Sequence, residues 1–219
     1  MRLRGYERVL IAATLALAVA PPALAARQCE AVVGEGWPPA MGNYGEAAAH
    51  LLGAQAEDGL SLLVLPPRGV ETQVLLRRDA AGGQWTVLAA QADERIHTWN
   101  SGRDRAGVSL RLEQQPQFAS APLPDALAQR LVAAWANALV LPEVAPRAPV
   151  TEGEVVSFTV NGERYSGTRP ACGQLEALLA QAALLVELAH GKDKKHEKRY
   201  AEIERALDKM HNRFSGDAG

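Results

Sequence analysis

The feature that most constrains the fold is a segment whose helical pattern is apolar on almost every side. Leu175 to Ala189 consists nearly entirely of Leu, Ala and Val, interrupted by Glu176 and Glu187. A surface helix buries one apolar stripe, whereas a helix that is apolar most of the way round is buried on more than one side. We therefore expect this helix to lie across a β-sheet with another element covering its back, and to end at His190-Gly191.

A β-hairpin is predicted shortly before this helix. Val156 to Val160 alternates apolar and polar side chains, and Asn161-Gly162 follows it. Asn-Gly is the strongest short-range hairpin signal, because both central residues of a type I′ turn take positive φ. A turn of two residues places Phe158 opposite Tyr165 as a cross-strand aromatic pair.

Upstream segments predict the rest of the sheet. Leu60 to Leu65 is a continuous apolar run, which is typical of a buried strand. Val108 to Glu113 alternates, so we expect one face of it, including Leu112, to be packed and the other to be wet. Short turns between the segments predict an antiparallel meander. A weaker strand is expected at Glu71–Arg78, a further strand at Trp85–Ala90 and a short one at Arg95–Asn100.

Two helices and a linker are expected among these strands. Asn43 and Glu46 have the spacing of a helix N-cap and its partner, ahead of an Ala-rich helix that runs to Glu57. Residues 125–140 carry large apolar side chains four apart on one stripe, which predicts a second helix. Residues 116–124, rich in Pro, Ala and Ser, are expected to be a linker. The predicted fold class is α+β: an antiparallel β-meander plus a C-terminal β-hairpin covered by helices.

The N-terminus has the pattern of a secretory signal peptide, residues 1–25. A positively charged start precedes an uncharged apolar run from Val9 to Ala20, and cleavage is expected between Ala25 and Ala26. A helix of that length rises about 18 Å, which is too short for a hydrocarbon core of about 30 Å. We therefore expect an exported, soluble, periplasmic protein.

Cys29 and Cys172 are the two cysteines of the chain. Two thiols in an exported protein most simply pair, so a structural disulfide is predicted between them. The alternative, a redox or nucleophilic cysteine, lacks a C-x-x-C motif or a nearby basic partner. A lipid anchor is not expected, because Arg27 and Gln28 stand where lipoprotein signals carry small residues.

A charged, helix-favouring tail, residues 192–219, follows a single domain over residues 26–191, with a candidate subdomain boundary near residues 142–150. Three interpretations of the tail stay open: it folds back onto the apolar helix, it docks against a partner or a second copy, or its Lys-rich start is weakly attracted to anionic lipid. Its apolar residues are spaced three and four apart and form what we call the seam: Tyr200, Ile203, Leu207, Met210 and Phe214.

No catalytic motif, metal site or cofactor is predicted from the sequence. The histidines lack the convergent spacing of metal ligands. Asp93, Glu94 and Asp104 are the best candidates for an acid–base pair, with solvated turn carboxylates as the alternative. Trp99, beside a polar loop, is the candidate contact residue. The formal net charge of −2 indicates no overall attraction to nucleic acid.

Four short features resemble a loosely defined group of exported proteobacterial α+β proteins with no assigned function. They are Leu65-Pro66, the Gly-then-Trp strand over residues 83–87, Trp135-x-x-Ala138-Leu139, and the Gly-x-x-Tyr hairpin over residues 162–165. The resemblance spans residues 59–189. It departs at Gly167, where the group carries an aromatic residue, and in the charged tail. It implies an α+β envelope protein and carries over no functional residue.

Together these observations favour a non-catalytic periplasmic binding or protein-interaction protein. Its partner is unknown, and contact through Trp99 or self-association through the seam is expected. The first alternative is a periplasmic hydrolase that uses the carboxylates between Asp93 and Asp104. The second is an inhibitor or immunity protein for a secreted toxin.

Overall fold

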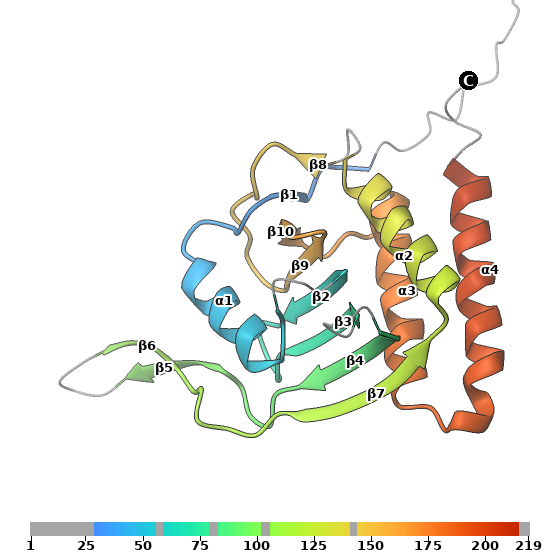
Figure 1. Cartoon of the computed structure of the whole chain (residues 1–219). Helices are drawn as coiled ribbons and strands as arrows, with labels where there is room; N and C mark the ends of the chain where they lie inside the picture. The colour runs from blue at the N-terminus through green and yellow to red at the C-terminus, as the bar shows by residue number, and fades with distance from the viewer. Residues whose placement is uncertain (1–28, 56–58, 79–82, 102–105, 141–143, 215–219) are drawn as a thin grey trace, which may run out of the picture.

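The computed structural model describes residues 29–55, 59–78, 83–101, 106–140 and 144–214 (Figure 1). An eight-stranded sheet forms the centre, α-helices cover both of its faces, and a two-stranded hairpin projects away from it. The elements in chain order are β1 (Val33–Glu35), α1 (Gly42–Leu51), β2 (Leu60–Leu65), β3 (Thr72–Arg78), β4 (Trp85–Gln91), β5 (His97–Ser101), β6 (Ala106–Leu110), β7 (Gln117–Leu123), α2 (Asp125–Leu139), β8 (Val144–Ala145), β9 (Val155–Val160), β10 (Glu163–Thr168), α3 (Gly173–Ala189), the short 3₁₀-helix η1 (Asp193–Lys195) and α4 (His196–Phe214).

The strand order of the large sheet is β7-β4-β3-β2-β9-β10-β1-β8. Neighbouring strands are antiparallel, except that β1 and β8 are parallel. Strands β2, β3 and β4 form the predicted meander, and β7 adds to it after the chain has made the separate β5–β6 hairpin. Strand β9 pairs with β2, with Phe158 opposite Leu62, so the later hairpin lies inside the same sheet. The predicted α+β fold class is confirmed.

The β9–β10 hairpin has the predicted register. Phe158 lies opposite Tyr165, and Asn161 and Gly162 take φ values of 50° and 83°, as a type I′ turn requires. Phe158 is fully buried and meets Trp135 of α2 edge to face, with ring centroids 5.8 Å apart. Aromatic pairs in this geometry add about 0.5–1.5 kcal/mol beyond the burial of their area.

Helix α3 is covered on two sides, as its apolar pattern predicts. It packs against β3, β4 and β7 on one side and against α2 and α4 on the other, and Figure 1 shows α4 alongside it. Leu178, Leu185 and Leu188 are fully buried, and each contributes about 1.5–3 kcal/mol relative to an exposed side chain. The helix ends at Ala189 with His190 as its C-cap.

The segment expected to be a linker is strand β7, so that prediction is wrong. Ala121 and Leu123 of this strand are buried in the main core. Strand β7 stands at the edge of the sheet and pairs with β4 on one side. An edge strand tolerates a residue such as Pro122, whose missing N–H would break the ladder of an interior strand.

Two predicted boundaries also differ from the structure. Helix α1 has Met41 as its N-cap and ends at Leu51, and the expected capping residue Glu46 accepts a hydrogen bond from Trp37 Nε1 at 2.7 Å instead. Strand β6 ends at Leu110, and Leu112 is 44% exposed rather than packed. The reason is that β5 and β6 form a ribbon that pairs with itself, outside the large sheet.

Cys29 and Cys172 form the predicted disulfide, with Cα atoms 6.0 Å apart, inside the usual range of such bridges. The bridge ties the segment before β1 to the N-cap position of α3. The predicted signal peptide, with Ala25 and Ala26, lies outside the described residues. Among the described helices, none combines the length and the hydropathy that a bilayer span requires.

Candidate functional site

A cleft of about 240 Å³ lies between the C-terminal half of α3 and the sheet. One stripe of α3 forms its roof, and residues of β2, β3 and β4 form its floor. The alanines in these walls, Ala89, Ala182 and Ala183, leave space that a leucine would fill. The apolar walls consist mainly of Leu62, Val64, Val74, Ala89, Leu179, Ala182, Ala183 and Val186.

Polar side chains border this cleft along a row of strand ends, which we call its polar end. Thr72, Gln91 and Gln117 lie side by side in the register of β3, β4 and β7, and all three line the cleft. Arg169, just after β10, and His190, at the C-cap of α3, also line the cleft, although they flank opposite ends of this 17-residue helix. The described residues that line the cleft include this Arg and His and no Asp or Glu.

The guanidinium of Arg169 already holds a carboxylate. Its Nη1 donates to Glu154 Oε1 at 2.8 Å, and both side chains are partly exposed. Arg presents five N–H donors in a planar fork that suits carboxylates. The polar end of the cleft is therefore suited to a group that accepts hydrogen bonds.

The composition of the cleft is that of a binding site. General acid–base catalysis needs a positioned proton donor and acceptor, and the described lining supplies no carboxylate to pair with His190. Apolar walls with a few polar groups at one end are the usual composition of small-molecule sites.

Sequence reasoning missed the polar end of the cleft. Arg169 stands close to Cys172 in the sequence, and nothing in its local spacing points to a cleft. Gln91 lies on the same face of β4 as the buried residues Val87 and Ala89, and is itself exposed at the end of the strand. A polar residue in an inward-facing position at a strand end is the one signal that points to this site.

The candidate contact residue Trp99 lies on β5, opposite Val108 of β6. Strands β5 and β6 pair with each other and, among the described residues, with no strand of the large sheet. Figure 1 shows this hairpin, which we call the arm, projecting away from the body. The arm therefore presents strand edges to solvent.

A buried carboxylate holds the base of the arm. Glu71 is fully buried and accepts hydrogen bonds from Tyr44 Oη at 2.5 Å, Ile96 N at 2.9 Å and His97 N at 3.3 Å. Burial, reinforced by the hydrogen bond to Glu71, raises the pKa of the Tyr44 phenol above its ordinary value. This carboxylate fixes where the chain leaves the sheet. No spacing in the sequence distinguishes Glu71 from a solvated glutamate.

The candidate acid–base carboxylates do not come together in the described residues. Asp93 and Glu94 are exposed, and Glu94 pairs with Arg111 at 2.5 Å. Asp104 lies outside the described residues. The hydrolase hypothesis draws no support from this region.

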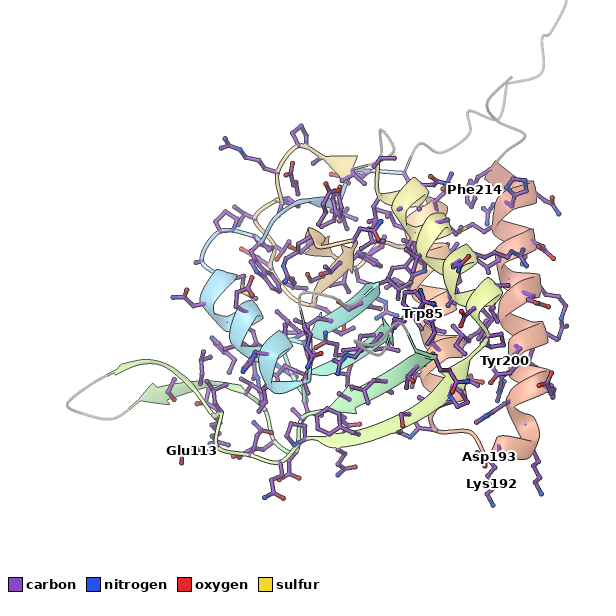
Figure 2. The ribbon with its side chains drawn as sticks, in the orientation of Figure 1. Trp85, Glu113, Lys192, Asp193, Tyr200 and Phe214 are labelled. Atoms are coloured by element: carbon purple, nitrogen blue, oxygen red, sulfur yellow. A yellow bond between two sulfur atoms is a disulfide. The ribbon has the colours of Figure 1, made fainter. Side chains whose placement is uncertain are left out.

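The seam packs inside the molecule. Ile203, Leu207 and Met210 are buried in the main core, and Tyr200 Oη donates to the Pro122 carbonyl of β7 at 2.9 Å. Figure 2 shows Tyr200 and Phe214 near opposite ends of α4. Of the three interpretations of the tail, the structure shows the first, in which α4 folds back onto α3. In this conformation those three seam residues are not accessible to a partner.

A buried polar relay joins the three helices of this face. Trp135 Nε1 of α2 donates to Gln181 Oε1 of α3 at 2.9 Å, and Gln181 Nε2 lies 3.5 Å from the sulfur of Met210 in α4. Arg130 and Asp208 pair at 2.7 Å between α2 and α4. These contacts set the register of α4 on its neighbours.

A second, more polar hollow of about 280 Å³ lies between α1 and the β9–β10 hairpin. Arg164 stacks on Trp37, with its guanidinium carbon 4.4 Å from the ring centroid, and donates to Ser157 Oγ at 3.2 Å. Burial lowers the pKa of this guanidinium. Since Trp37 also donates to Glu46 of α1, these contacts attach α1 to the hairpin.

The histidines are dispersed over the structure. In the described part of the chain, no three His, Cys, Asp or Glu side chains are grouped as metal ligands. His97 lies against Tyr44, with ring centroids 4.9 Å apart, and His196 lies near Tyr200 at 6.2 Å. His190 is the one histidine that lines the cleft.

Fold and site together define an α+β protein with an apolar cleft that is polar at one end. No protein-family model, no curated protein and no solved structure matches the chain.

Proposed function

We propose that this chain is a non-catalytic periplasmic binding protein that holds a small amphipathic molecule in the cleft between α3 and the sheet. The observation that carries the proposal is the composition of the cleft, which has apolar walls bordered by polar groups at the strand ends. Export is supported by the signal-peptide pattern and by the Cys29–Cys172 bridge, because disulfides persist in oxidising compartments.

The test is to fill the cleft. Ala183 is exposed at the cleft wall, so Ala183→Trp places an indole there without opening the core. Ala201→Trp, on the exposed side of α4, is the matched control. Saturation-transfer NMR with octan-1-ol measures binding to each purified protein.

Wild type and Ala201→Trp should bind octan-1-ol with the same affinity, whereas Ala183→Trp should bind at least tenfold more weakly. Equal binding by all three proteins, or no binding by wild type, would overturn the assignment of the cleft. Urea unfolding of each variant checks that the fold is intact.

A second candidate function is protein contact through the arm. The observation that favours it is that, within the described part of the chain, the strands of the arm pair with each other alone, while buried Glu71 fixes their base. Exposed edges accept an extended segment of a partner. Affinity purification from envelope extract with wild type and Trp99→Ala tests it, and recovery of the same proteins by both argues against contact through Trp99.

A further inference from the structure

The size of the cleft limits its occupant to a short chain. Each water in the liquid takes about 30 Å³, so a cleft of about 240 Å³ holds on the order of eight non-hydrogen atoms. Drug-sized ligands occupy about 300–1,000 Å³. The apolar walls run from Leu62 of β2 to Val186 of α3, so the part of the ligand that they enclose is apolar.

The charge at the polar end favours an anionic head. Among the described lining residues, Arg169 is charged, His190 is titratable, and none is acidic. Beyond His190 the chain continues into the exposed Lys192, which Figure 2 shows at the turn before α4 together with Asp193. The nearest acidic residue of α3, Glu187, pairs with Arg199 at 2.7 Å.

The intramolecular pair indicates how the head would bind. Arg169 binds the Glu154 carboxylate in a pair that is open to solvent, and such exposed pairs are worth about 0–1 kcal/mol. An incoming carboxylate can therefore replace Glu154 at little cost. The C-terminus of α3, which ends beside His190, carries the negative end of its helix dipole. Arg169 precedes the opposite, N-terminal end of this 17-residue helix, so a head bound to its guanidinium lies away from the negative end of the dipole.

We propose that the ligand of the cleft is a medium-chain carboxylate, whose chain of about six to ten carbons lies under α3 and whose head displaces Glu154 from Arg169. This inference rests on the proposed binding function of the cleft and adds the chemical class of its ligand. Arg169 selects the anionic head, and Glu154 competes with it.

The test compares octanoate with octan-1-ol, which share a chain and differ in the head. Isothermal titration of the whole protein is run on wild type, Arg169→Gln and Glu154→Gln. Arg169→Gln should weaken octanoate binding by about three- to fivefold, the upper range for an exposed ion pair, and leave octan-1-ol within twofold. Glu154→Gln should tighten octanoate binding several-fold and leave octan-1-ol unchanged.

Chain length supplies the second measurement. Each buried methylene should raise the affinity about fourfold from butanoate upward, until the cleft is full at about six to ten carbons. Continued gain beyond about ten carbons would mean that the chain lies outside the cleft, and would overturn the inference.

The outcomes separate the two proposals. If octan-1-ol binds and Ala183→Trp abolishes its binding, but Arg169→Gln affects both ligands equally or neither, the carboxylate inference fails while the binding function stands. If neither ligand binds wild type, both fail. Arg169 and Glu154 are partly exposed, so both variants are expected to fold, and a urea unfolding curve verifies it.

Discussion

The two faces of the central sheet are covered in different ways. The face under α2, α3 and α4 holds the large apolar cluster, which includes Trp135, Phe158 and Leu178. The face under α1, a single ten-residue helix, holds a smaller apolar cluster. By strand register, several buried polar residues lie on this second face: Ser61, Glu71, Gln73 and Ser157.

The two faces therefore depend on different interactions, apolar contact on one and hydrogen bonds to buried polar groups on the other. Apolar contact is non-directional. Alanines on the helix-rich face can therefore leave a cleft without depriving a buried polar group of its hydrogen-bond partner. A buried polar group needs partners at fixed positions. Glu71 therefore fixes one geometry, the departure of the arm, while the opposite face leaves room for a ligand.

The largest expected effect is on the helix-rich face. Trp135→Ala removes a fully buried indole and leaves Gln181 without its donor, so the free energy of unfolding should fall by about 4 kcal/mol. Urea titration followed by circular dichroism measures it. Val140→Ala, at a side chain that is 72% exposed, is the control and should change stability by less than about 0.5 kcal/mol. Similar losses in both variants would contradict the assigned core.

The disulfide belongs to neither face, so its loss should affect both faces alike. The bridge closes a loop with a sequence separation of 143 residues, and the Cys29→Ser, Cys172→Ser double variant should lose about 3 kcal/mol. Thermal unfolding with and without reductant measures the loss in wild type. Unfolding that does not respond to reductant would mean that the two thiols are not joined in the protein.

The polar face is tested at Glu71. Glu71→Gln keeps the shape of the side chain but exchanges an acceptor oxygen for a donor, which faces the hydroxyl of Tyr44 or an amide of the arm. We expect a loss of about 2 kcal/mol and faster amide hydrogen exchange at Ile96 and His97, with little change in α3. Glu94→Gln, at an exposed pair, is the control, worth about 0.5 kcal/mol. If Glu71→Gln speeds amide exchange equally on both faces, the proposed difference between the two faces is wrong.

The smallest expected effect is at alkaline pH. The pKa of Tyr44 in the folded protein is raised by burial and by Glu71, above the ordinary value of 10.0. Above that value the unfolded chain loses the phenolic proton while the folded protein keeps it. Stability should therefore fall as pH rises past 10, by up to about 1.4 kcal/mol per pH unit. Tyr44→Phe should flatten this slope between pH 10 and 11, and an unchanged slope would assign it to other groups.

What the sequence by itself determined is the set of local elements. Asn161-Gly162 specified the turn and register of β9–β10, because only a few residues take positive φ at both turn positions. The apolar pattern of residues 175–189 required cover on two sides, and each of the two cysteines had one possible partner in the chain. These signals depend on neighbours in the chain.

Tertiary structure alone decided the features that depend on residues far apart in sequence. The segment around Pro122 became a strand because an edge position tolerates proline. Glu71 became buried because donors from α1 and from the start of the arm converge on it. The cleft exists because alanines of α3 and β4 meet there, and Arg169 reaches it only through the order of strands. The spacing of residues along the chain does not predict these long-range contacts, because they depend on how whole helices and strands pack in three dimensions.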